Sequence, residues 1–316
     1  MKQHFSFLIL IFLIILTMSD VTFGQSSVAI TIDDVPNTGK FRKDNFTSKL
    51  LKELDSLNVP VTVFITEGLL YKGDSIGKNF ELLQNWINRD NATIGYHSSQ
   101  HSRYSEVGLD SFKIDVERGE SVIREAAQKH GKSVEYFRMP YNDLGKDSVQ
   151  HAGIERYLSS KNYKIAPFTV ESADWMFNYI YEYYLEKKDS VKARETAGKY
   201  IAKTLAYFDF FDSLALKLYG RPISQIYLCH DSRLNADYLP VLLAEMKKKN
   251  YKIISFNDAL QDKVYKQKDN YYKKWGISWV YRWMKNQEEI SFFQKQEPEE
   301  DSYDLYKKLM QQQKQQ

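Results

Sequence analysis

The sequence predicts an α/β fold, an irregular (β/α) barrel, on two observations. Short apolar or β-branched runs alternate with amphipathic helical segments from residue 27 to residue 256, which indicates parallel strands joined by crossover helices. Titratable side chains follow the ends of several of these runs, the position at which (β/α) barrels carry their active sites.

Each element rests on its own periodicity. Alternating or continuously apolar runs predict strands over residues 27–33, 59–66, 92–97, 134–140, 164–170, 224–230 and 251–256. Apolar residues at helical spacing predict helices over residues 45–58, 79–90, 109–131 and 238–250.

Two segments do not fit the alternation. Residues 176–220 form a Tyr- and Phe-rich helical insertion, which either walls off a substrate groove or packs on the outside as extra helices. Residues 263–316 form a C-terminal extension that begins with aromatic residues and ends in the Gln-rich sequence QQQKQQ, which we expect to be disordered. Its stretch WGISWVYRWMK could be a membrane-surface helix, but we expect it to dock on the barrel. The catalytic domain then spans residues 25–262.

The N-terminus has the features of a secretory signal peptide over residues 1–24. Lys2 precedes a short apolar run, and Thr22 and Gly24 place small residues before a cleavage site at Gln25. We expect a secreted or periplasmic protein with no stable membrane span after cleavage. An uncleaved single-helix anchor is the alternative.

Composition limits the partners and the redox chemistry. The chain has 44 basic and 41 acidic residues, a net charge of +3, and no basic stripe that would predict nucleic acid binding. Cys229 is the single cysteine, so the chain forms no internal disulfide. Because it lies next to a strand-end histidine, alternation places it on the opposite face, as a buried core thiol.

Histidines and aspartates supply the chemical signal. His97 and His101 stand four residues apart, downstream of the adjacent pair Asp33 and Asp34. Two histidines and one aspartate are a ligand set for a divalent metal such as zinc. The other aspartate would lie beside the metal, where a hydrolase needs a base.

Five motifs in order resemble the NodB-type polysaccharide deacetylases of carbohydrate esterase family four. They are TIDD (31–34), HSSQH (97–101), RMPY (138–141), SADW (172–175) and LCH (228–230). The resemblance covers about residues 27–260 without the insertion. It implies a NodB-type barrel and assigns a role to each matching residue.

The implied catalytic residues are a base, a metal triad and an acid. Asp33 would be the base, and Asp34, His97 and His101 would hold zinc, with cobalt, manganese or nickel as other ions that such ligands accept. The remaining catalytic roles fall to Arg138, which would orient the base, to His230, the general acid, and to Asp174, which would raise the pKa of His230.

The resemblance also implies a substrate-binding wall. Pro140 and Tyr141 would shape the groove, and the Tyr141 backbone N–H would stabilise an oxyanion. Trp175 and Leu228 would form an apolar floor, although core packing explains them equally well. Two positions depart from the family pattern: Ile32 replaces a common Phe, and Asn142 replaces a common Gly.

The function implied is removal of acetyl groups from an envelope polysaccharide, with N-acetylglucosamine of peptidoglycan as the first expectation. Chitin-like glycans, acetylated xylan and exopolysaccharide are other substrates. One alternative is an amidase or imidase of the same fold that acts on a small cyclic amide. The other is a carbohydrate-binding or scaffolding protein with an inactive site.

Overall fold

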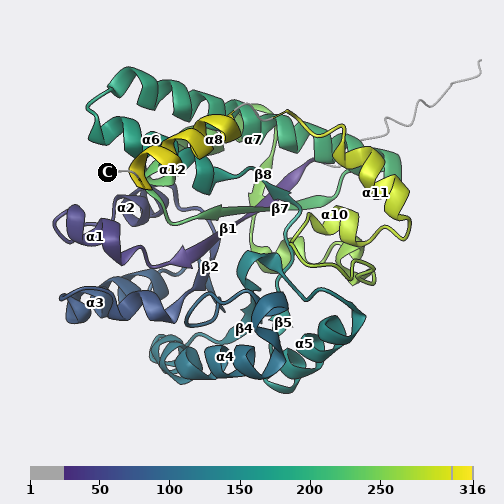
Figure 1. Cartoon of the computed structure of the whole chain (residues 1–316), viewed down its shortest axis with the longest axis horizontal. Helices are drawn as coiled ribbons and strands as arrows, with labels where there is room; N and C mark the ends of the chain where they lie inside the picture. The colour runs from purple at the N-terminus through teal and green to yellow at the C-terminus, as the bar shows by residue number, and fades with distance from the viewer. Residues whose placement is uncertain (1–24, 300–301, 315–316) are drawn as a thin grey trace, which may run out of the picture.

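The strands form one parallel sheet that curls into a partial barrel, which confirms the expected fold (Figure 1). The computed structural model describes residues 25–299 and 302–314, so the expected signal peptide lies outside the described residues. The spatial order is β5-β4-β3-β2-β1-β7-β6, and β8 also pairs with β1. The strands are β1 Ser27–Val35, β2 Val61–Ile65, β3 Ala92–Tyr96, β4 Val134–Phe137, β5 Lys164–Ile165, β6 Val170–Glu171, β7 Ser224–His230 and β8 Lys252–Ile254.

Helices surround the sheet (Figure 1). Sequence analysis did not name the helices α1 and α5, and α2 begins later than expected because Ser48 caps its N-terminus. The α-helices are α1 Thr38–Lys43, α2 Lys49–Leu57, α3 Ile76–Ile87, α4 Tyr104–Gln128, α5 Ser148–Ser160, α6 Asp174–Glu186, α7 Ser190–Tyr219, α8 Arg233–Lys248, α9 Phe256–Ala259, α10 Trp279–Arg282, α11 Gln287–Gln294 and α12 Ser302–Lys314.

Alternation along the strands divides the hydrophobic core in two. One small cluster contains Ala29 of β1 with Ile226 and Leu228 of β7, together with aromatic residues such as Phe64. The neighbouring positions Val28 and Tyr227 belong instead to the large cluster that includes the surrounding helices. Because successive strand residues point to opposite faces, the small cluster is the barrel interior and the large one is the helix-covered exterior.

The expected strand over residues 164–170 is wrong in one respect. It is two short strands at opposite ends of the sheet, because β5 pairs with β4 whereas β6 pairs with β7. Pro167 lies between them and has no N–H to donate to a ladder, which breaks the apolar run. Residues 166–169 therefore form a loop that connects the two edge strands. The Ala166 N–H donates to the Phe137 carbonyl and the Thr169 N–H donates to the Ile226 carbonyl (2.9 Å each).

The insertion folds into α6 and the long helix α7. The two helices pack against each other and against α8 (Figure 1). Buried aromatic side chains on both helices, Phe177, Tyr200 and Phe208 among them, join the exterior core. The insertion therefore packs on the outside of the barrel as extra helices, the second of the two expected alternatives.

The aromatic stretch of the extension packs on the barrel. The Trp279 N–H donates to the Phe168 carbonyl (2.9 Å) and the Ser278 hydroxyl donates to the Thr169 carbonyl (2.6 Å). Val280 and Tyr281 are buried. These contacts fit docking rather than a membrane-surface helix.

The expectation of a disordered C-terminus is wrong over residues 311–314. Helix α12 continues through Gln311 to Lys314 and lies against α6 (Figure 1), with Leu309 buried and Tyr306 in contact with the Tyr179 ring. Packing of a few apolar residues thus orders a polar sequence. Among the described residues, no helix is both long and apolar enough to cross a bilayer.

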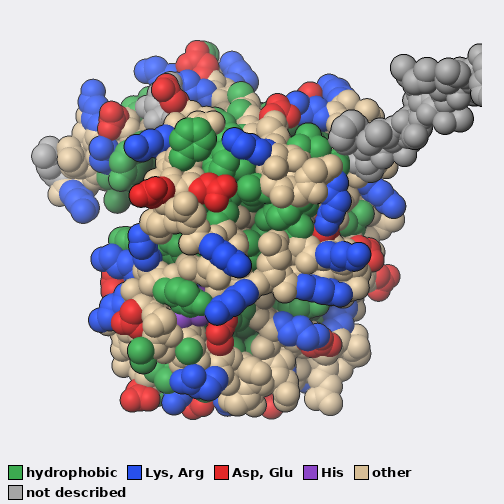
Figure 2. All heavy atoms as spheres, turned by 90° about the vertical axis from the view of Figure 1, so that its right-hand side faces the viewer, with side chains coloured by type: hydrophobic (Ala, Val, Ile, Leu, Met, Phe, Trp, Pro, Cys, Tyr) green, Lys and Arg blue, Asp and Glu red, His purple; other side chains and the backbone are tan. Residues whose placement is uncertain are grey.

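Charges of both signs share the surface. On the face in Figure 2, Lys and Arg side chains lie among Asp and Glu side chains, with hydrophobic side chains between them. This mixture agrees with the near balance of 44 basic and 41 acidic residues. Among the exposed large hydrophobic residues, Tyr141, Trp175 and Trp275 are the three that line a cavity with the predicted site residues.

A buried charged cluster anchors the extension to the barrel. Asp269 accepts hydrogen bonds from Arg282 Nε (2.8 Å) and from His151 Nε2 of α5 (2.9 Å). All three side chains are at most 5 % exposed. Because buried charges are costly unless they are paired, this cluster fixes the extension in one position.

We expect Asp269→Asn to lower the free energy of unfolding by about 3 kcal/mol, because Arg282 would be left buried without its countercharge. Urea denaturation measures the loss. The control Glu245→Gln removes the exposed pair with Lys248 (2.6 Å) and should cost less than about 1 kcal/mol. Equal losses in the two variants would contradict an anchoring role.

Candidate active site

Strand register places Asp33 beside His230. β1 and β7 run parallel with Thr31 opposite Leu228 and Asp33 opposite His230. Leu228 faces the barrel interior, so His230, two residues further on, has the same orientation. Cys229 points the other way, is buried, and lies 3.5 Å from the Thr31 carbonyl oxygen.

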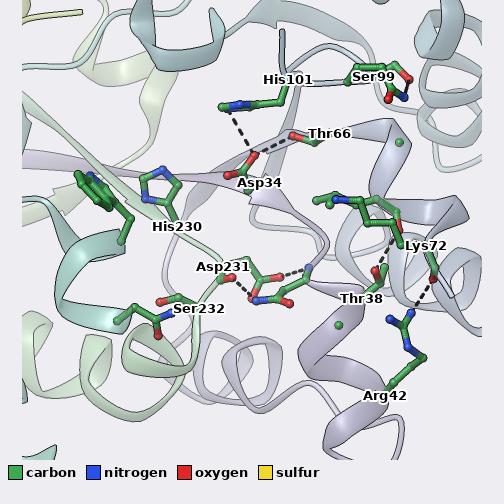
Figure 3. A pocket seen from close by; sticks show the side chains of 17 residues that line it. Asp34, Thr38, Arg42, Thr66, Lys72, Ser99, His101, His230, Asp231 and Ser232 are labelled. Carbon is green, nitrogen blue, oxygen red and sulfur yellow. Dashed lines mark hydrogen bonds and ion pairs between the residues drawn. The ribbon is translucent and has the colours of Figure 1, made fainter. Parts of the chain in front are cut away.

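Asp34, His97 and His101 form a cluster of potential metal ligands. One ligand atom from each lies within 4.8 Å of the others, and His101 Nε2 is 3.7 Å from Asp34 Oδ1. That separation is too long for a hydrogen bond, but two atoms each about 2.1 Å from one ion can lie about 4 Å apart. In Figure 3, His101 and Asp34 point toward each other at the cavity, and the Thr66 hydroxyl donates to Asp34 (3.0 Å).

The two histidines are held in the form that binds metals. His97 Nδ1 is 2.7 Å from the Arg138 carbonyl oxygen and donates to it, so Nε2 presents its lone pair to the cluster. Burial lowers the pKa of both His97 and His101 to about 4. Burial would raise the pKa of Asp34, but the neighbouring histidines, His230 among them, and the hydrogen bond from Thr66 lower it below its usual value. Neutral imidazoles and an ionised carboxylate fit a divalent ion.

Asp115 holds the loop that carries His101, a role that sequence analysis missed. Its Oδ1 accepts from the backbone N–H groups of Ser99 (3.0 Å) and Gln100 (2.6 Å), and its Oδ2 accepts from Ser102 (3.1 Å). The side chain is buried on α4. A carboxylate on the apolar face of a predicted amphipathic helix is the sequence signal that could have found it.

Asp33 is a buried carboxyl with one free acceptor. It is 2 % exposed, and Oδ1 has no hydrogen-bond partner among the described residues. Burial raises its pKa above the usual value, although Arg138, with Nη1 3.8 Å from Asp33 Oδ2, opposes the shift. Arg138 is itself fixed by Thr31 Oγ1 (3.1 Å) and the Pro167 carbonyl oxygen (3.2 Å). The arrangement leaves a basic oxygen beside the metal cluster.

His230 is paired with Asp174. Its Nδ1 donates to Asp174 Oδ1 (2.7 Å), while Asp174 Oδ2 accepts from the His230 N–H (2.8 Å) and from Asn235 Nδ2 (2.6 Å). Burial would lower the pKa of His230, but the Asp174 carboxylate outweighs it and raises the pKa to about 10. His230 is therefore protonated at neutral pH and can donate a proton.

Tyr141 lies in a strained turn beside the metal cluster. Pro140 begins the turn, and both Tyr141 (φ 57°) and Asn142 (φ 51°) have left-handed backbone conformations. Asn tolerates this conformation better than most residues, so Asn142 fits where the family often has Gly. The Tyr141 ring packs against His101, with ring centres 4.5 Å apart.

Two adjoining cavities meet at the cluster. The first, of about 550 Å³, extends toward Arg42 and Lys72 (Figure 3). The second, of about 630 Å³, contains Leu228 in its lining. They share four residues in their linings, Asp34, His101, Trp175 and His230.

Glu171 is a second residue that sequence analysis missed. It lines the larger cavity, and burial raises its pKa to about 7, with the nearby Asp174 adding to the shift. It accepts from the Ala173 N–H (2.7 Å). Its position at the end of β6, in a run read as one strand, was the signal that could have found it.

The family comparison agrees with the motifs. Residues 20–156 match the model of the polysaccharide deacetylase family. This range contains the first three motifs, and the motifs around Asp174 and His230 lie beyond it. This match supports the resemblance to the polysaccharide deacetylases that the first three motifs indicate.

Solved structures share the fold at low sequence identity. One is a mutant of BA3943, a CE4 family pseudoenzyme from Bacillus anthracis, with restored enzymatic activity; it is 16 % identical, with 75 % of this chain and 68 % of that chain covered at a TM-score of 0.50. Another is the Xyl-CE4 domain of a multidomain xylanase from the hindgut metagenome of Trinervitermes trinervoides, also 16 % identical, with 75 % and 91 % covered at a TM-score of 0.50. No curated protein sequence gives a significant match.

We expect Asp115→Ala to weaken zinc binding about 10- to 100-fold, because the loop around His101 loses the acceptor for three N–H groups. Competition with a chromogenic chelator measures the affinity. Asp110→Ala is the matched control, since Asp110 lies on the same helix with a side chain 99 % exposed. Unchanged affinity in Asp115→Ala would contradict the role assigned to this carboxylate.

We expect Asp174→Asn to move the basic limb of the pH–activity profile from about 10 to lower pH. The protonated form of His230 is present below its pKa and is lost as pH rises through it. Without the Asp174 charge, burial still lowers that pKa and the largest opposing influence is gone. Initial rates from pH 5 to 10 test this. His230→Gln should remove the limb altogether, and an unmoved limb in Asp174→Asn would assign it to another group.

Proposed function

We propose that this protein is a metal-dependent hydrolase that removes acetyl groups from an envelope or extracellular polysaccharide. The observation that carries the proposal is that two groups lie at neighbouring strand ends beside the Asp34–His97–His101 cluster. One is Asp33, whose Oδ1 has no hydrogen-bond partner among the described residues, and the other is His230, which is paired with Asp174. The match of residues 20–156 to the polysaccharide deacetylase family supports the same chemistry.

The residues divide the proton transfers between them. A divalent ion, when held by Asp34, His97 and His101, supplies a Lewis acid that polarises the acetyl carbonyl and lowers the pKa of a water molecule. Asp33 Oδ1 accepts the proton of the attacking water, and Arg138 keeps that carboxyl oriented. His230 Nε2 donates a proton to the sugar nitrogen or oxygen as its bond to the acetyl carbon breaks, which yields acetate and the free amine or hydroxyl.

The N-terminal sequence supports a proposal on where the protein acts and on which glycan. We infer that residues 1–24 direct the protein out of the cytoplasm and that Gln25 begins the mature chain. Envelope glycans are then the polymers it meets, and N-acetylglucosamine of peptidoglycan or of a chitin-like glycan is the proposed acetyl donor. Zinc is the proposed ion, with cobalt, manganese and nickel as ions the same ligands accept.

The shape of the site favours a glycan over a small cyclic amide. The two cavities adjoin across the metal cluster. Of the insertion, only Asn178 on α6 lines them, next to Trp175, which immediately precedes the insertion. Helix α7 therefore does not close the site into a small pocket. An extended polymer can therefore lie across the cluster.

We expect the mature protein with added zinc or cobalt to release acetate from peptidoglycan, chitooligosaccharides or acetylxylan. Asp33→Asn and His101→Ala should each lower the rate at least about 100-fold, because one removes the base and the other a metal ligand. Acetate is measured enzymatically. Release that survives both substitutions, or one bound metal per chain with no release from any glycan, would overturn the proposal.

A further inference from the structure

Trp275 is brought to the active-site cavity by the C-terminal extension. The residues that follow it pack on the barrel, with Val280 and Tyr281 buried. Trp275 itself is 50 % exposed and lines the larger cavity together with Gly276, Tyr141 and the metal-cluster residues. A large aromatic ring that is left in solvent beside a polar site marks a binding surface.

A series of aromatic and cation–π contacts connects Trp275 to the metal cluster. The Tyr141 ring contacts His101, with ring centres 4.5 Å apart. The Arg103 guanidinium lies 3.8 Å from the centre of the Tyr141 ring and 4.2 Å from the centre of the Trp275 ring. The order outward from the metal cluster is therefore His101, Tyr141, Arg103 and Trp275.

The extension fits closely against the turn that carries Tyr141. Gly276 N–H donates to the Tyr141 carbonyl (3.2 Å), and a side chain at Gly276 would clash with Asn142 at 2.1 Å. Trp275 has a left-handed backbone (φ 77°), a conformation that costs energy in a bulky residue and persists only where its surroundings impose it. The indole is thus held in a defined position.

We propose that Trp275 is a sugar-stacking residue that binds the ring next to the one being deacetylated, so that the substrate is an oligosaccharide or longer glycan rather than a single sugar. The inference rests on the proposed deacetylase function. The apolar C–H face of a pyranose covers an exposed aromatic ring, as apolar surfaces cover aromatic anchors in binding sites generally. Arg103, stacked with the indole, keeps the ring in place.

A second tryptophan lies on the acid side of the same cavity. Trp175 is 45 % exposed, follows Asp174 directly, and is braced by the Tyr306 ring of α12 (5.5 Å between ring centres). The extension therefore supports one aromatic ring beside the metal cluster and another beside the acid.

The test is the preference for a long over a short substrate. Trp275→Ala should lower the ratio of kcat/KM for N,N′,N″,N‴-tetraacetylchitotetraose to that for N-acetylglucosamine about tenfold, mainly through KM, because one aromatic anchor is lost. Trp275→Phe keeps an aromatic face and should retain most of the preference. Phe292→Ala is the control, since Phe292 is 58 % exposed on α11 and lines neither cavity.

Binding separates this inference from the proposed function. Isothermal titration calorimetry measures binding of the tetrasaccharide to the Asp33→Asn variant. Adding Trp275→Ala to this variant should weaken binding about tenfold and leave the thermal unfolding temperature unchanged. An unchanged length preference and unchanged binding, in a protein that deacetylates the tetrasaccharide, would overturn the role of Trp275 alone. No binding and no acetate release by any variant would overturn the role of Trp275 together with the deacetylase proposal.

Discussion

Parallel pairing of β1 with β7 is the constraint on which the site depends. With Asp33 opposite His230, alternation turns both side chains into the barrel interior. A shift of one residue in this register would bury Ile32 where the base is needed. The apolar residues on the outer face of β1, among them Val28 and Ile30, fix the register because their burial against the helices would be lost.

Burial raises the pKa of Asp33 and lowers that of His230, and a charged side chain opposes each of these shifts. Burial raises the pKa of Asp33, and Arg138, 3.8 Å away, opposes this rise. Burial alone would also deprotonate His230, and Asp174 reverses it at 2.7 Å. Arg138 is too far from Asp33 for a hydrogen bond, whereas Asp174 is hydrogen-bonded to His230. Asp33 is therefore suited to act as a base and His230 as an acid. The metal-site histidines have no such close carboxylate and stay neutral.

The insertion and the extension contribute to the site only at their nearest ends. The start of α6 brings Trp175 to the cavities and Asp174 to His230, whereas α7 serves as outer packing. The C-terminal extension brings Trp275 and Gly276 against the turn at Tyr141. Trp175 and Trp275 therefore line the same cavity although they are far apart in the sequence.

The sequence by itself determined most of the strand–helix order, the five motifs and the candidate metal ligands, because these depend on local periodicity and on residue type. His97, His101 and one aspartate of the Asp33–Asp34 pair could be named from the sequence, since strand ends of a parallel barrel meet at one rim. The resemblance to the deacetylases indicated Asp34 as the ligand. Tertiary structure decided what depends on contacts distant in sequence. Examples are the break at Pro167, the loop held by Asp115, the ordered helix α12 and the position of Trp275. Each of these follows from which surfaces pack together, and a polar helix or an exposed tryptophan has no local signal for its partner.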